Sequence, residues 1–162
     1  MSSLSDFKFI AFLNELDLSL DLDSFESRLL LQKRMYLAQW LGLNLNLRYG
    51  WYIHGPYSTD LSHMAYRLQK ISQDSKIQDL LPNLSKDEKK KVSEAKRLFA
   101  VVDKLGKNVD YWYELVASLI FLKESNYPKP SNNKEVASVL EEKKPGKFRQ
   151  PDVEKALSLI KR

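Results

Sequence analysis

The stretch FESRLLLQKRMYLAQWLGLNLNLRYGWYIHGPYSTDLSHMAYRL, residues 25–68, decides how this chain folds. Residues 25–41 carry apolar side chains around almost the whole circumference of a helix, and a helix that is apolar on nearly all sides is buried. We therefore expect the rest of the chain to pack around this helix. Its polar exceptions should mark a narrow exposed strip: Arg28, Gln32, Lys33 and Gln39.

The middle of the stretch does not have the spacing of a helix. Residues 43–54 alternate leucine with polar residues and then become aromatic, and this period of two predicts extended chain, with a hairpin turning near Gly50 as one form of it. We expect Gly55-Pro56 to end any strand, because proline cannot donate a ladder hydrogen bond. Ser58 then caps an amphipathic helix with apolar residues at i, i+3, i+4 and i+7.

Outside this stretch, helical spacing predicts further helices near residues 4–16, 85–105, 110–122, 134–142 and 151–160, with a polar connector at 69–84. Ser85-Lys-Asp-Glu88 has the spacing of a capping box, and we expect Asp110 to cap the helix that follows. Gly42 suits a left-handed helix C-cap.

The predicted fold is a single, mainly α domain of residues 1–162 with a small β-hairpin or extended element at about 43–54. The loop 126–133 is the one plausible boundary, and it would make residues 131–162 a C-terminal helical appendage.

Composition narrows the class of protein. An apolar content of 43% and a charged content of 29% are ordinary for a soluble globular chain. The absence of cysteine excludes disulfides, thiolate zinc sites and thiol nucleophiles, and it fits a reducing cytoplasm. No apolar run approaches the roughly 20 residues that span a bilayer. We expect a cytoplasmic protein without a signal peptide or a membrane span.

The net charge of +5 is unevenly distributed. Residues 1–27 carry one basic and six acidic groups, whereas residues 86–107 and 129–162 each have four more basic than acidic groups. One interpretation is that the acidic first element meets the basic later helices in the fold. The alternative is that the basic helix faces contact nucleic acid or an acidic protein partner.

The residues needed for catalysis are sparse. His54 and His63 lie nine residues apart without a third ligand at regular spacing, and five isolated glycines cannot build a phosphate cradle. Glu114 and Glu124 do not form a matched carboxylate pair. We expect no enzymatic activity, no metal and no cofactor. His54 is predicted to be a partly buried ring bonded to backbone, with a place in a ligand or partner groove as the alternative.

Aromatic and basic residues of the central stretch form the best candidate for binding a protein partner. Aromatic side chains and arginines dominate the energetics of protein interfaces. The alternative is that these rings only fill the core between the second and third helices. The candidate partner-binding residues are Arg34, Arg48, Trp51, Tyr52, His54, Tyr57 and Arg67.

A second hypothesis is a nucleic-acid-binding protein of winged-helix type. The helix from Ser58 carries few of the side chains that read bases, so the phosphate-contacting strip would be the basic face of the helix that opens at Ser85. Lysine-rich helix faces also occur simply as solvated surface. The residues of this face are Lys86, Lys89, Lys90, Lys96 and Arg97.

Two stretches resemble a known pattern. LQKRMYLAQ (31–39), followed by YIHGPYS (52–58) and a helix, is similar to the "LQKxxYxAQ … YGPYS" pattern of the YwgA-like uncharacterised prokaryotic proteins. It is more distantly similar to the Panacea antitoxin domain (SocA/GepA-type) of phage and mobile-element loci. Residues 111–122 and the closing Lys147-Phe148 and Ala156-Leu157 resemble the YwgA-type ending more loosely. His54 departs from the pattern, because those families often have Tyr or Phe before Gly-Pro.

This resemblance implies a small, mostly helical, cytoplasmic protein that binds another protein as an antitoxin or regulator. Together with the residue patterns, it predicts a non-enzymatic protein-interaction module, antitoxin-like or regulatory, of the kind found in mobile-element or phage-defence loci. The sequence does not set an oligomeric state.

Overall fold

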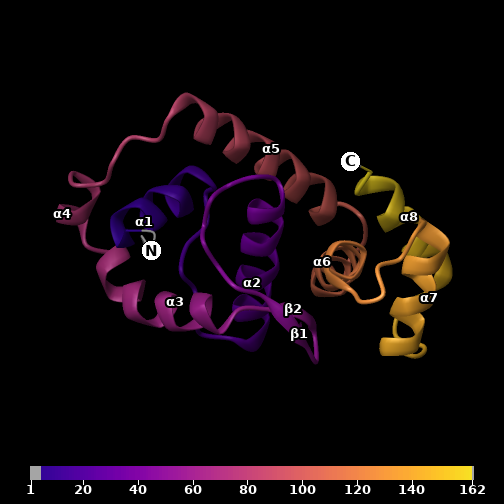
Figure 1. Ribbon diagram of the computed structural model, residues 1–162. Helices are drawn as coiled ribbons and strands as arrows, with labels where there is room; N and C mark the ends of the chain where they lie inside the picture. The colour runs from indigo at the N-terminus through magenta and orange to yellow at the C-terminus, as the bar shows by residue number, and fades with distance from the viewer. Residues whose placement is uncertain (1–4, 162) are drawn as a thin grey trace.

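The computed structural model describes residues 5–161, and this part of the chain is mainly helical with one small two-stranded antiparallel sheet (Figure 1). The predicted fold class is confirmed. In chain order the elements are α1 (Asp6–Glu15), α2 (Phe25–Trp40), β1 (Gly50–Tyr52), β2 (Gly55–Tyr57), α3 (Thr59–Ser72), α4 (Ser75–Gln78), α5 (Lys86–Asp103), α6 (Val109–Ser125), α7 (Asn133–Lys143) and α8 (Gln150–Leu159).

Helix α6 lies at the centre and contacts α2, α5, α7, α8 and β2. Figure 1 shows it nearly end-on, with α2 and the hairpin on one side and α7 and α8 on the other. Every residue from 112 to 120 is buried, which is possible because the sequence carries no charge between Glu114 and Lys123. Helix α2 packs against α6 as a second buried helix, and α7 and α8 complete the core from the C-terminal side.

Most helix ends follow the sequence signals. The capping box of α5 is formed in both directions: Glu88 N donates to Ser85 Oγ at 3.1 Å, and Ser85 N donates to Glu88 Oε1 at 2.8 Å. Gly42 follows α2 with a φ of 117°, in the left-handed region expected of a C-cap glycine. The predicted cap at Asp110 is wrong. Asn108 caps α6 instead, with its side-chain oxygen accepting from Tyr111 N at 3.2 Å.

The predicted connector 69–84 is also partly helical. Helix α3 continues to Ser72, and the short α4 follows with Asp74 as its N-cap. None of the helices within residues 5–161 has the length and apolarity needed to cross a bilayer.

The β-hairpin lies further along the chain than residues 43–54. β1 pairs with β2 so that Trp51 faces Pro56, and the turn falls at Ile53-His54 rather than near Gly50. Pro56 therefore sits inside a strand, contrary to the prediction that Gly55-Pro56 ends it. A ribbon of two strands consists entirely of edges, so a residue without an N–H is tolerated there.

Residues 43–49 alternate as predicted but pair with no strand of the described chain. Leu43, Leu45 and Leu47 are buried, and the polar residues between them are exposed. The backbone of Leu47 is instead held by the side chain of Gln39, whose Nε2 donates to Leu47 O at 2.9 Å and whose Oε1 accepts from Leu47 N at 3.0 Å. A side-chain amide thus supplies the donor and acceptor that a neighbouring strand would supply.

Gln32 holds the other end of the hairpin in the same way. Its Nε2 donates to Ser58 O at 2.9 Å, and its Oε1 accepts from Ser58 N at 2.8 Å. Gln32 is 4% exposed and Lys33 is 1% exposed, so the prediction that they lie on an exposed strip of α2 is wrong. These polar residues are buried because the hairpin segment covers them and takes up their hydrogen bonds.

Gly55 is required where the hairpin meets α6. Its φ is 88°, and a Cβ on it would lie 2.4 Å from Ser118 Oγ. Gly146 gives a matched comparison, because its φ is 69° and a Cβ there meets nothing within 4 Å.

We predict that Gly146→Ala lowers the free energy of unfolding by about 1 kcal/mol through backbone strain alone. Gly55→Ala should lower it by about 2 to 4 kcal/mol, because overpacking against Ser118 adds to the strain. Urea denaturation of both variants measures the difference. Equal losses for the two glycines would show that the hairpin does not approach α6 as closely as described.

Candidate functional site

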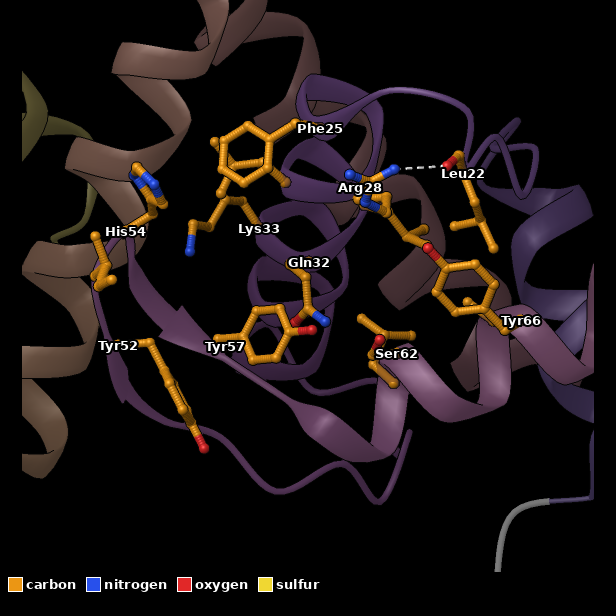
Figure 2. Close-up of a pocket in the computed structure, with 16 residues that line it drawn as sticks. Leu22, Phe25, Arg28, Gln32, Lys33, Tyr52, His54, Tyr57, Ser62 and Tyr66 are labelled. Atoms are coloured by element: carbon orange, nitrogen blue, oxygen red, sulfur yellow. Dashed lines mark hydrogen bonds between the residues drawn. The ribbon is translucent and has the colours of Figure 1, made fainter.

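A pocket of about 320 Å³ opens between α2, the hairpin and α3. Its wall is mostly apolar, and Figure 2 shows that the side chains converge on it from all three elements. A concave, mainly apolar pocket with a few polar groups is the usual form of a binding site. The lining residues are Leu22, Phe25, Arg28, Leu29, Leu31, Gln32, Lys33, Tyr52, Ile53, His54, Gly55, Tyr57, Leu61, Ser62, Ala65 and Tyr66.

Lys33 is the polar group deepest in the wall. In Figure 2 its side chain extends from α2 into the space between Phe25 and His54, and its Nζ donates to Pro56 O at 2.6 Å. Burial lowers the pKa of this ammonium to about 7, an effect opposed by the carboxylate of Glu114 and reinforced by the positive charges of Lys144 and Lys147. Lys33 is thus a buried amine close to neutralisation at physiological pH.

His54, in the hairpin turn, contacts a carboxylate that comes from α6. Its Nδ1 lies 3.3 Å from Glu114 Oε1, and Glu114 Oε2 lies 2.6 Å from the Nζ of Lys147. The ring of Phe25 packs edge-on against the imidazole with 5.2 Å between centroids. The prediction that His54 bonds to backbone is therefore wrong, because a buried acid 60 residues away is its partner.

In many enzymes a carboxylate orients the Nδ1 of a histidine that acts as a general base. Such a pair activates a nucleophile only when the nucleophile lies within hydrogen-bonding distance of the histidine. Among the described residues, the pocket hydroxyls of Tyr52, Tyr57, Ser62 and Tyr66 make no hydrogen bond to His54 or Lys33. Ser118 Oγ, behind Gly55, is fully buried. The contacts with Glu114 and Phe25 hold the imidazole in the pocket wall. Within residues 5–161, no three His, Asp or Glu side chains gather as a metal site.

The pocket brings together three of the predicted partner-binding residues, Tyr52, His54 and Tyr57. The rings of Tyr52 and Tyr57 pack edge to face at 5.2 Å. Trp51 does not line the pocket. Its ring lies 5.8 Å from that of Phe121 on α6, and the ammonium groups of Lys143 and Lys144 approach its centroid to 5.9 and 5.7 Å.

The three predicted arginines lie outside the pocket, each beside an acid. Arg48 makes two hydrogen bonds of 2.9 Å to Asp60, and Arg67 pairs with Asp6. Arg34 faces Asp103 at 3.7 Å and packs over the ring of Tyr113. Their charges are engaged in surface or half-buried ion pairs.

Sequence reasoning missed several residues that shape this site, and the signals for them are of unequal strength. Polar residues in a helix that is otherwise apolar all round, such as Lys33, are a usable sign of a buried polar role. Exposed Phe25 and Tyr66 carry no such sign, because amphipathic spacing does not report on a local hollow. The residues missed are Phe25, Arg28, Gln32, Lys33, Ile53, Tyr66 and Glu114.

The alternative site on α5 is partly neutralised. Lys96 pairs with Asp17 at 2.7 Å, so the acidic N-terminal segment does meet this basic helix. Within the described part of the chain, the other four members of the face are exposed and form no ion pair: Lys86, Lys89, Lys90 and Arg97.

No protein-family model, curated protein or solved structure matches this chain.

The lowered pKa of Lys33 predicts how stability depends on pH. The folded protein releases this proton near pH 7, whereas the unfolded chain keeps it to about 10.5, so the unfolded state binds more protons between these values. The free energy of unfolding should therefore rise with pH in this window, by at most about 1.4 kcal/mol per pH unit.

The measurement is urea denaturation of the natural sequence and of Lys33→Met from pH 6 to 9. The variant lacks the titrating amine but keeps Glu114, Lys144 and Lys147 around it, so their contributions largely cancel. The difference between the two proteins should be constant below pH 6.5 and should grow in favour of the natural sequence above pH 7. A difference that stays flat to pH 9 would contradict the buried position of Lys33.

Proposed function

We propose that this protein is a non-enzymatic protein-interaction module that captures a partner protein through the pocket between α2, the hairpin and α3. One observation carries this proposal. Four large apolar side chains of the pocket are about half exposed or more: Phe25 (50%), Tyr52 (49%), Ile53 (78%) and Tyr66 (55%). An exposed apolar cluster around a hollow is typical of a surface that a partner covers.

The position of these side chains favours a macromolecule over a small ligand or substrate. A small-molecule site encloses most of its ligand's surface within its own walls. Here the apolar groups are exposed to solvent, and the hairpin turn carries Ile53 furthest into it. A flat or protruding apolar surface of a second protein would cover them together.

The resemblance to the YwgA-like and Panacea proteins supports an antitoxin-like or regulatory role for this capture. The two stretches that carry the resemblance lie against each other at the pocket, where Gln32 bonds to Ser58 and Lys33 bonds to Pro56. We propose that the partner is a protein encoded in a mobile-element or phage-defence locus. The absence of cysteine is consistent with our proposal that this takes place in the cytoplasm.

The test is quantitative capture of partner proteins from the native host. We expect Ile53→Asp and Tyr66→Asp each to reduce recovery about tenfold or more, because each places a charge in an apolar contact. Tyr127→Asp is the matched control, since Tyr127 is 96% exposed in the α6–α7 loop and does not line the pocket. Equal recovery by all three variants and the natural sequence would overturn the proposal.

Nucleic-acid binding by α5 is the second candidate, in keeping with the winged-helix-like alternative. Lys86, Lys90 and Arg97 are spaced i, i+4 and i+11, which places them on one side of the helix, and all three are exposed without an acidic partner in the described chain. Such a row of cations fits a phosphate backbone.

If α5 contacts phosphates, duplex DNA or RNA should shift in gels at low salt, and affinity should fall steeply as salt rises. The double variant Lys86→Glu/Lys90→Glu should reduce the slope of log K against log salt by about 0.9 per lost contact. Lys129→Glu, in the α6–α7 loop, provides a charge-reversal control. No shift with the natural sequence at low salt would remove this candidate.

A further inference from the structure

We infer that the pocket is selective for a segment of a partner protein that presents a carboxylate next to a large apolar side chain. This inference rests on the proposed function and specifies the chemistry of the partner. Three observations support it: the cationic side chains of the pocket wall, the unused N–H donors of these side chains, and the exposed apolar side chains beside them.

The charges lining the pocket are all of one sign. Of the described residues in its wall, Arg28 is a permanent cation, Lys33 is an amine whose pKa lies at about 7, and none is an aspartate or glutamate. In Figure 2 both side chains extend from α2, Arg28 toward Leu22 and Lys33 toward the hairpin, with the imidazole of His54 on the far side of Lys33. Glu114, whose carboxylate raises the pKa of Lys33, does not line the pocket; it contacts His54 and pairs with Lys147.

Both cations keep unused donors. Lys33 uses one of its three N–H bonds on Pro56 O, and Arg28 Nη1 donates to Leu22 O at 2.9 Å. Within residues 5–161 neither forms an ion pair of 4 Å or less. The three arginines predicted to bind a partner, Arg34, Arg48 and Arg67, each have a carboxylate, so Arg28 differs from these three in facing a site without one.

Because Lys33 lies in surroundings of low polarity, the affinity of the pocket for a ligand depends strongly on the sign of the ligand's charge. A buried ammonium that forms no close ion pair is costly, and burial therefore lowers the pKa of Lys33 to about 7 although the carboxylate of Glu114 opposes this shift. A carboxylate entering from solvent would restore the charged form and accept charge-assisted hydrogen bonds. An amide gains less, and an ammonium would be repelled by both cations.

The apolar rim determines what must accompany the carboxylate. Phe25 and Tyr66 stand on opposite walls of the hollow, on α2 and α3, and leave a volume of about 320 Å³, at the small end of the range for ligand sites. This space suits one or two side chains of a docking segment. The occupant that satisfies both features is a partner segment in which Phe or Leu neighbours Asp, Glu or the chain's own terminal carboxylate.

Three capped dipeptides test the inference on the intact protein: acetyl-Phe-Glu-amide, acetyl-Phe-Gln-amide and acetyl-Phe-Lys-amide. They share an aromatic side chain and differ in charge. Titration into ¹⁵N-labelled protein, followed by amide chemical shifts, should place all binding at the pocket. We expect the Glu peptide to bind about tenfold more tightly than the Gln peptide, and the Lys peptide to bind least.

Variants identify the cations responsible. Arg28→Met should bring the affinity for the Glu peptide close to that for the Gln peptide, and Lys33→Met should do the same where it folds. Lys86→Met removes an exposed cation outside the pocket and should leave the preference unchanged. Equal affinity for the three peptides, tightest binding of the Lys peptide, shifts confined to other surfaces or no shift at all would each overturn the inference.

These outcomes are distinct from those of the proposed function. If Ile53→Asp abolishes partner capture while the peptides show no charge preference, the protein binds its partner at the pocket by apolar contact alone. If the rim variants leave capture unchanged, the proposed function itself fails, whatever the peptides do.

Discussion

Two side-chain amides of α2 hold the part of the chain on which the site depends. Gln39 and Gln32 bond to both backbone polar groups of Leu47 and Ser58, one before and one after the hairpin. A two-stranded ribbon is marginal on its own in water, and buried backbone groups must be paired. The glutamines meet both requirements, because they replace missing strands while the ribbon packs against α2 and α6.

The pocket is a consequence of this arrangement. A helix with buried polar residues faces a short ribbon rather than a full sheet, so a hollow remains between them, and Lys33 closes one end through Pro56. Two features here cost stability: an amine buried beyond the reach of an ion pair, and large apolar rings left in water. Local costs of this kind concentrate where a protein binds or reacts, which is the physical basis for proposing a partner site here.

Local signals in the sequence predict local structure well. The apolar periodicity, the serine caps and the capping box place the helices, and the leucine alternation of residues 43–47 gives the correct buried side. The errors at the site share a cause, which is that they depend on contacts between distant segments. The burial of Gln32 and Lys33 requires the hairpin, and the partner of His54 comes from Glu114, 60 residues later. No pattern along the chain predicts which distant segments come into contact, so these parts of the pocket are not predictable from the sequence.

Native-state amide hydrogen exchange tests most directly whether the glutamines hold the hairpin. The amides of Leu47 and Ser58 donate only to side chains of α2, whereas those of Asn44 and Asn46 donate to no group in the described chain. The account predicts strong protection at Leu47 and Ser58, none at Asn44 and Asn46, and selective loss at Ser58 in Gln32→Met. Exchange at Ser58 as fast as at Asn44 in the natural sequence would contradict it.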